Sequence, residues 1–167
     1  GLFKGYLNRP EATRETLVDG WLRSGDLGRR DSDGFLYFLG RSKDIIRRGG
    51  ENVAAAEVEQ VLRAHPKVLE AAAVAVPDEL RGEEVKAYVV LVDGETPGSV
   101  TPEELVEHCA AELANYKVPR YIAYRNEFPR TPSMRVRKPE LIAEVDDLTL
   151  DAWDREAESP TSAGRRA

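Results

Sequence analysis

The sequence has 167 residues, of which 41% are hydrophobic and 32% are charged, and its formal net charge is −6. Its length suits one medium domain or a small domain with additional pieces, and no apolar run approaches the roughly 20 residues of a membrane-spanning helix. The negative charge disfavours nucleic-acid binding through general phosphate neutralisation. One Cys and two His exclude an internal disulfide, argue against a metal site and favour a reducing, cytoplasmic setting.

The first part of the chain predicts a short helix and a β-hairpin. Residues 1–20 are rich in turn-forming residues, and the segment "PEATRETL" favours a helix that begins at Pro10. Two extended runs follow at residues 21–23 and 35–39, separated by a polar connection rich in Asp, Gly and Ser. We therefore expect these two runs to pair with each other as a hairpin.

Two later segments predict helices. Residues 52–66 place apolar side chains at helical spacing and end at Pro66. Residues 101–116 begin with a capping box formed by Thr101 and Glu104. The apolar positions that we expect to face a core on these helices are Val58, Val61, Leu62, Leu105, Val106, Cys109 and Leu113.

Three segments predict strands, at residues 69–78, 83–94 and 120–129. The second is apolar on both faces, which is typical of a central strand. Because helices and strands alternate within a compact stretch, the predicted fold is a small α+β sandwich rather than a doubly wound sheet. Periodicity is lost from about Thr149, and residues 146–167 are predicted to form a disordered tail.

Three charged residues near the hairpin are candidates for ligand contacts. Asp26 in "SGD" could accept hydrogen bonds from a sugar diol, although its spacing is also that of an ordinary turn Asp. Arg41 could reach a ribose or phosphate oxygen with its five donors, or it could be a solvated surface charge. Lys43 lies where backbone rotation would move everything that follows, and a plain linker is the alternative.

Adjacent glycines at positions 49 and 50 are a further candidate site. Gly49 and Gly50 lack a Cβ atom and can take positive φ, so their backbone admits a closely approaching ligand. An ordinary turn is the alternative. The segment lacks the ending of a phosphate-binding P-loop and the spaced glycines of a dinucleotide-binding fingerprint.

Residues 129–141, "PRTPSMRVRKPEL", form a basic segment with three prolines in an otherwise acidic chain. This pattern indicates an anion-binding loop or a nucleic-acid patch. The segment has no interleaved aromatic residues on which bases could stack, so nucleic-acid binding is the less favoured of the two. Its basic residues are Arg130, Arg135, Arg137 and Lys138.

In this order, the segments "GYLNRPEAT", "WLRSGDLGRR", "GRSKDIIRRGGENV", "YKVPRYI" and "FPRTP" resemble the C-terminal part of adenylate-forming acyl-CoA synthetases, the ANL superfamily. The resemblance extends over about residues 5–142. Within that superfamily, "GGENV" and "ELANYKVPRYI" are similar to the crotonobetaine/carnitine-CoA ligase-like acid ligases. The implied organisation is the last β-hairpin of a large AMP-binding domain in residues 1–41, followed by a small mobile C-terminal lid domain in residues 42–145.

The resemblance implies a two-step ligase reaction. A carboxylate attacks ATP to give an acyl-adenylate and pyrophosphate, and the thiol of coenzyme A then displaces AMP. ATP implies Mg²⁺, which residues of this chain are not expected to bind. The partners are a carboxylic acid, coenzyme A and a large N-terminal domain that these 167 residues do not include. The chain alone, which begins with Gly, is therefore expected to be an inactive part of something longer, of unassigned oligomeric state.

The resemblance also implies roles for five residues. Asp26 would hold the hydroxyls of the AMP ribose, and Arg41 would add a ribose contact. Lys43 would be the hinge about which the lid turns between the two half-reactions. Gly49 and Gly50 would line the tunnel of the pantetheine arm of coenzyme A.

One position departs from the family pattern. Family members usually carry Gly-Lys after the "PRTPS"-like segment, and that Lys bridges the substrate carboxylate and the α-phosphate during adenylation. This sequence has Met134 and Arg135 there. Since a planar guanidinium does not freely replace a compact ammonium between two anions, we expect a slow or differently organised first half-reaction. Arg137 or Lys138 could also reach the site.

Two other readings remain open on the sequence. The module could be the lid of an adenylation domain that loads a carrier protein, although no carrier sequence follows in these residues. It could also be a non-catalytic interaction module that lost the adenylation lysine.

Overall fold

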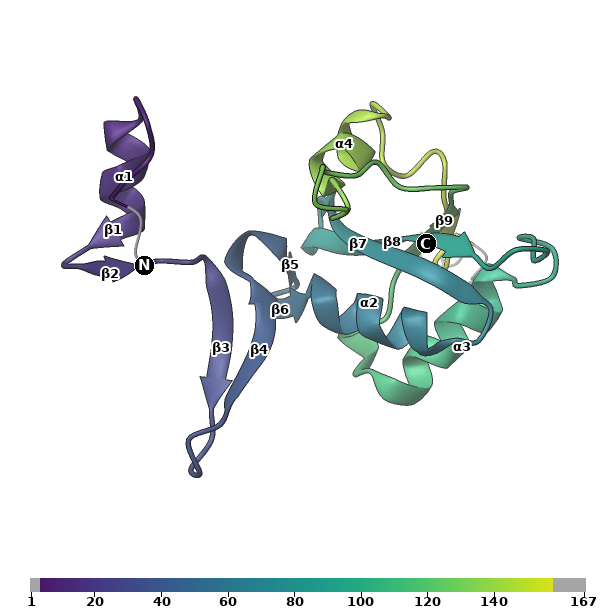
Figure 1. Cartoon of the computed structure of the whole chain (residues 1–167). Helices are drawn as coiled ribbons and strands as arrows, with labels where there is room; N and C mark the ends of the chain where they lie inside the picture. The colour runs from purple at the N-terminus through teal and green to yellow at the C-terminus, as the bar shows by residue number, and fades with distance from the viewer. Residues whose placement is uncertain (1–3, 158–167) are drawn as a thin grey trace, which may run out of the picture. The chain divides into compact units, whose positions relative to one another are not determined.

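The computed structural model describes residues 4–157. The chain divides into two compact units, an N-terminal unit of residues 1–43 and a C-terminal unit of residues 44–167 (Figure 1). A short 3₁₀ turn, Ser42–Asp44, contains the point of division.

The described part of the N-terminal unit, residues 4–43, consists of one helix and two separate strand pairs. The helix α1 (Pro10–Thr16) begins at the proline, as predicted. Strands β1 (Leu17–Val18) and β2 (Trp21–Leu22) pair with each other, and β3 (Asp26–Arg30) pairs with β4 (Leu36–Arg41).

The predicted pairing of residues 21–23 with 35–39 is therefore wrong. The strand of residues 21–22 closes back on β1 through Asp19 and Gly20, which have φ values of 52° and 81°. Asp-Gly is a preferred two-residue hairpin turn because both positions need positive φ, and this local signal decides the partner.

The N-terminal unit has almost no core. Gly40 is the single buried residue among residues 4–43. Large apolar side chains are exposed instead, and they are Leu7, Trp21, Phe35, Leu36 and Phe38 at 65% or more, with Tyr6, Leu22, Leu27, Tyr37 and Leu39 at 40% or more.

The described residues of the C-terminal unit form a six-stranded sheet. Its strands are β5 (Ile45–Arg48), β6 (Glu51–Ala54), β7 (Val68–Asp78), β8 (Gly82–Leu91), β9 (Tyr121–Tyr124) and β10 (Trp153–Asp154). Strand β8 pairs antiparallel with β7, parallel with β9, and through one residue pair with β5. The prediction that residues 83–94 supply the central strand is thereby confirmed.

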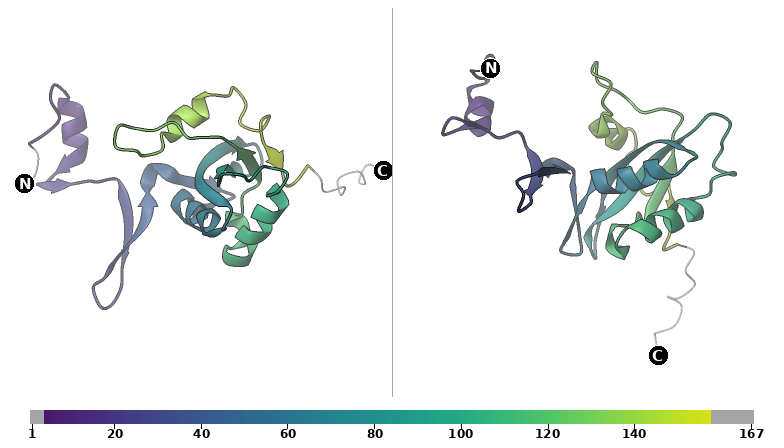
Figure 2. Two further views of the ribbon diagram at one scale, coloured as in Figure 1. Left: turned by 45° about the vertical axis from the view of Figure 1, so that its right-hand side comes forward. Right: turned by 60° about the horizontal axis from the view of Figure 1, so that its bottom comes forward.

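Helices cover both faces of this sheet (Figure 2). On one face lie α2 (Ala55–Ala64) and α3 (Pro102–Glu112), and the Thr101 hydroxyl caps α3 by accepting the Glu104 amide at 3.3 Å. On the other face, α4 (Lys138–Ala143) packs Leu141 against Tyr88 and Phe128. The α+β fold agrees with the prediction.

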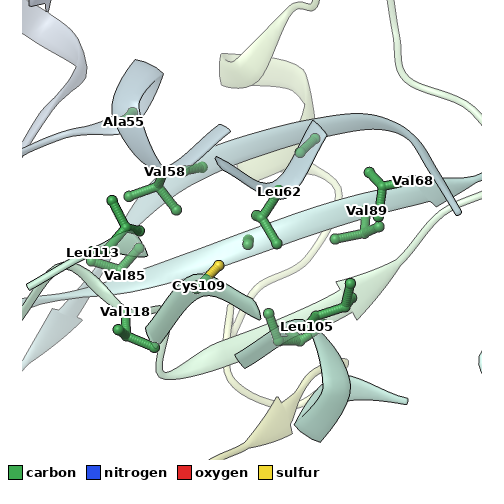
Figure 3. Packing of buried hydrophobic residues seen from close by; sticks show 14 of the residues in the cluster. Ala55, Val58, Leu62, Val68, Val85, Val89, Leu105, Cys109, Leu113 and Val118 are labelled. Carbon is green, nitrogen blue, oxygen red and sulfur yellow. The ribbon is translucent and has the colours of Figure 1, made fainter. Parts of the chain in front are cut away.

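The main core lies between α2, α3 and the sheet (Figure 3). Leu62 and Leu105 are 0% exposed, as is Cys109, whose thiol pKa burial raises to about 12. Cys109 is therefore a core residue, as predicted, because such a thiol does not ionise near neutral pH.

Residues 146–157, the described part of the predicted disordered tail of residues 146–167, are ordered by specific contacts. Trp153 pairs with Ile122 and so adds β10 to the sheet edge, and Asp151 accepts hydrogen bonds from Lys86 and Arg125. The ordering comes from pairs between acidic residues and distant cations, which hydrophobic periodicity does not reveal. Residues 158–167 of that predicted tail lie outside the described residues.

Candidate functional site

Asp26 and Arg41 lie opposite each other at one end of the β3–β4 ladder. The Arg41 Nε and Asp26 Oδ1 atoms are 3.5 Å apart, and both side chains are about 40% exposed. The turn before β3 is fixed by Gly25, with a φ of 76°, whose carbonyl accepts the Ser42 amide at 2.9 Å. An acceptor and a donor fork thus stand side by side, which suits a diol because each hydroxyl both donates and accepts.

Lys43 is exposed and lies at the boundary between the two units. It is the middle residue of the 3₁₀ turn, and its side chain has no hydrogen bond or ion pair within residues 4–157. Few side-chain contacts therefore oppose a backbone rotation at this position.

Gly49 and Gly50 form the two-residue turn of the β5–β6 hairpin, with φ values of 58° and 87°. Both are exposed, and a Cβ atom added to either would meet no heavy atom of residues 4–157 within 4 Å. Positive φ at both positions explains the two glycines as hairpin chemistry. The turn also exposes two residues of main chain that carry no side chains.

The base of this hairpin is held by a buried charge cluster that the sequence analysis missed. The Gly49 amide donates to the Arg81 carbonyl at 2.8 Å, and Arg48 Nε donates to Glu84 Oε2 at 2.6 Å. Glu84 is 0% exposed and also accepts from Arg81. In the sequence, the available signal was a charged residue within each strand, Arg48 in β5 and Glu84 in β8, but 36 residues separate the two.

Arg135 is presented by a tight loop. The Thr131 amide donates to the Arg135 carbonyl at 2.9 Å, and Arg130 and Val136 form an isolated β-bridge below it. Met134 precedes Arg135 with a φ of 63°, a left-handed conformation that favours glycine. The Met134 backbone thus adopts the conformation that glycine would take most easily.

The other cations of the basic segment are already paired. Arg130 donates to Glu70, Arg137 Nη1 lies 2.5 Å from Glu140, and Lys138 Nζ lies 2.6 Å from Glu59 Oε1. The Arg135 side chain is exposed and has no hydrogen bond or ion pair within the described range 4–157. Of the four cations of the basic segment, Arg135 is thus the one without a charge partner among the described residues.

The hairpin turn and the Arg135 loop are attached at opposite ends of β7. The loop is held through Arg130 at Glu70, near the start of the strand, whereas the hairpin is held at Arg81, just after its end at Asp78. At about 3.3 Å per residue, the strand from Glu70 to Asp78 spans roughly 26 Å. The C-terminal unit therefore carries two separate candidate contact regions.

No metal centre is found in the part of the chain that the structure describes. Residues 4–157 contain no group of three or more His, Cys, Asp or Glu side chains placed to hold a metal ion. Within the same residues, no helix is long and apolar enough to cross a membrane.

Known proteins show where this arrangement belongs. Residues 57–135 match the family model of the AMP-binding enzyme C-terminal domain. The chain is 46% identical over 141 residues to a crotonobetaine/carnitine–CoA ligase from a Proteus species, covering 84% of this chain and 27% of that protein. It is 47% identical over 138 residues to a 2-succinylbenzoate–CoA ligase of Bacillus cytotoxicus, covering 83% of this chain and 28% of that protein.

Solved structures agree. The o-succinylbenzoate CoA synthetase of Bacillus subtilis in complex with its acyl-adenylate intermediate superimposes with a TM-score of 0.74 at 40% identity, covering 83% of this chain and 28% of that chain. The chain thus spans little more than a quarter of the length of these relatives. Residues 57–135 thus form an AMP-binding enzyme C-terminal domain, and the chain is homologous to the C-terminal portion of adenylate-forming acyl-CoA ligases.

Proposed function

We propose that the chain supplies the lid and hinge of an AMP-forming acid–CoA ligase. A carboxylate oxygen attacks the α-phosphorus of ATP with loss of pyrophosphate, which requires Mg²⁺ with the nucleotide. The sulfur of coenzyme A then attacks the acyl carbon of the adenylate, and AMP leaves with the electrons of the broken C–O bond. The relationship to two CoA ligases at 46% and 47% identity supports this activity.

The observation that carries the proposal is the separation of the two contact regions along β7. One rigid sheet cannot bring both ends of a strand of roughly 26 Å to the same reaction centre at once. A rotation between half-reactions removes this conflict: Arg135 faces the centre during adenylation, and Gly49 with Gly50 faces it during thioester formation. Catalytic lids commonly alternate by such hinge motions.

In this proposal the pivot is Lys43, residues 1–41 are the last hairpin of the large domain, and residues 42–145 are the rotating lid. The division of the chain after Lys43 supports it. Asp26 would accept hydrogen bonds from the AMP ribose, and Arg41 would donate to it. Gly49 and Gly50 would let the pantetheine arm pass along bare backbone.

Arg135 would supply the positive charge for adenylation. Arg137 and Lys138 are engaged by Glu140 and Glu59, which leaves Arg135 as the candidate. A guanidinium places its charge less closely between two anions than an ammonium, so adenylation would be slow while thioester formation is unaffected. In the full-length enzyme, Arg135→Lys should raise the rate of pyrophosphate exchange about tenfold or more. An unchanged or lower rate would show that the absence of a lysine at position 135 does not limit adenylation.

The test of the whole proposal uses the intact protein in its natural length. Pyrophosphate release and free-thiol loss are measured with ATP, coenzyme A and a panel of carboxylic acids. We expect both signals for at least one acid, with one thiol lost per pyrophosphate. Pyrophosphate release with transfer only to a pantetheinylated carrier protein would favour the adenylation-domain alternative. Neither pyrophosphate release nor thiol loss with any acid would favour the non-catalytic module. A cytoplasmic location, supported by the single buried Cys109, belongs to the same proposal.

A further inference from the structure

The C-terminal segment, residues 151–156, is fastened to the sheet by paired charges. Asp154 receives two hydrogen bonds from Arg120, both at 3.0 Å, in the two-pronged geometry that is strong for a guanidinium and a carboxylate. Glu156 Oε1 accepts from Arg81 at 2.6 Å, and the Arg155 amide donates to the Arg120 carbonyl at 2.9 Å. The segment therefore docks at a defined register.

Arg81 connects this segment to the glycine turn. Its guanidinium donates to both Glu156 and Glu84, and Glu84 also accepts from Arg48 at the base of the β5–β6 hairpin. Its carbonyl accepts the Gly49 amide. One residue thus joins the C-terminal segment to the turn by side chain and by main chain.

The same loop is fixed from a second side. Asp78 binds Arg120 Nη1 at 3.0 Å and accepts the amides of Leu80 and Arg81. Arg120 is shared between Asp78 and Asp154, so docking of the C-terminal segment also sets the loop that carries the Arg81 carbonyl.

The turn itself depends on this base. Among the described residues, no atom lies within 4 Å of a Cβ position at Gly49 or Gly50, so the orientation of the turn is set where the hairpin joins Arg81 and Glu84. Glu84 and Arg48 are 0% and 7% exposed, and buried charges hold one geometry because any other leaves a charge unpaired.

We propose that Asp154 and Glu156 are positioning residues for thioester formation: through Arg120 and Arg81 they hold the Gly49–Gly50 turn in the geometry that admits coenzyme A. This inference rests on the proposed function of the turn. It assigns a role in the second half-reaction to a segment that lies beyond the residues matched by the family model, 57–135.

The test compares the double variant Asp154→Asn/Glu156→Gln with Asp146→Asn in the full-length protein. Asp146 is exposed and has no charge partner among the described residues, so it is a matched control for loss of an acidic side chain. We expect the KM for coenzyme A to rise about fivefold in the double variant, with pyrophosphate exchange and kcat for adenylation unchanged. The control should match the wild type in all three.

A second readout does not depend on activity. Amide hydrogen exchange at residues 45–54 should be about fivefold faster in the double variant than in Asp146→Asn, with exchange in α3 unchanged. An unchanged KM for coenzyme A with unchanged exchange overturns the inference. Equal losses in both half-reactions, or faster exchange throughout the unit, would show a merely structural role and also overturn it. A wild-type enzyme that makes no thioester, with the exchange result as expected, would instead contradict the proposed function.

Discussion

The two units of the chain contrast in where their apolar side chains lie. The C-terminal unit buries Leu62 and Leu105 completely, whereas the N-terminal unit leaves Trp21 and Leu36 about 80% exposed. The N-terminal unit is held by hairpin turns and local hydrogen bonds, and the C-terminal unit by a shared core. An apolar surface of this extent is typical of a segment that packs against another part of a larger protein. One chain thus combines a unit that has its own buried core with a unit that leaves its apolar side chains exposed.

The largest expected effect comes from deleting core volume. Leu62→Ala should lower the free energy of unfolding by about 2–5 kcal/mol, because the substitution leaves a cavity at a fully buried site. Leu36→Ala makes the same chemical change at a site that is 80% exposed and should cost about 0.5 kcal/mol or less. Urea unfolding followed by circular dichroism measures both. Equal losses would show that Leu36 contributes as much packing as Leu62 and would contradict the contrast.

Loss of a charge should also affect the two units differently. Glu84→Gln leaves two guanidinium groups, Arg48 and Arg81, without their buried counter-charge, and should cost about 3 kcal/mol. Asp26→Asn, in an ion pair that is about 40% exposed, should change stability by about 0.5 kcal/mol or less. In the full-length enzyme, however, Asp26→Asn should weaken ATP binding. Thermal unfolding and adenylation rates separate the two effects, and a large stability loss for Asp26→Asn would contradict the contrast.

Acid should loosen the C-terminal segment of residues 151–156 first. Burial raises the pKa of both Asp151 and Asp154. For Asp151, the hydrogen bond and the charge of Lys86 outweigh burial, and Arg120 does the same for Asp154. Both pKa values therefore lie below their ordinary range. Because the pKa of each carboxyl is lower in the folded state, the two groups stabilise the fold at pH values above their unfolded-state pKa of about 3.9. This stabilisation is lost as the pH falls through the folded-state pKa.

The melting temperature should therefore hold steady down to about pH 5 and then fall. Asp151→Asn/Asp154→Asn should start lower and show a flatter fall below pH 4, and Asp146→Asn should follow the wild type. An unchanged slope in the double variant would show that these two carboxylates do not carry the acid sensitivity.

The smallest expected effect concerns the loop before Arg135. Met134→Gly removes a left-handed residue with a φ of 63°, a conformation that costs roughly 1–2 kcal/mol for most side chains. The gain is partly offset by the freedom of glycine in the unfolded chain, so the net stabilisation should be about 0.5 kcal/mol. Chemical denaturation measures it. A destabilisation would show that the Met134 side chain, although 68% exposed, contributes to packing.

Much of the secondary structure could be predicted, because its signals are local. Pro10 and Thr101 mark helix starts, and the apolar run of β8 marks a central strand. The partner of Trp21 was predicted wrongly, because the Asp19–Gly20 turn offered a nearer partner than the later apolar run. The C-terminal segment was missed because its order depends on charge pairs that no periodicity encodes.

For the candidate site, too, residue types could be predicted from the sequence, whereas contacts between distant residues could not. From the sequence we could read the resemblance to adenylate-forming acyl-CoA synthetases and the residues proposed for nucleotide and thiol contacts, Asp26, Arg41 and the paired glycines. The tertiary structure was needed to place Asp26 beside Arg41, and to find that within residues 4–157 Arg137 and Lys138 are paired whereas Arg135 is not. The physical reason is that an ion pair depends on where distant strands place two side chains, and neither sequence spacing nor residue type fixes that distance.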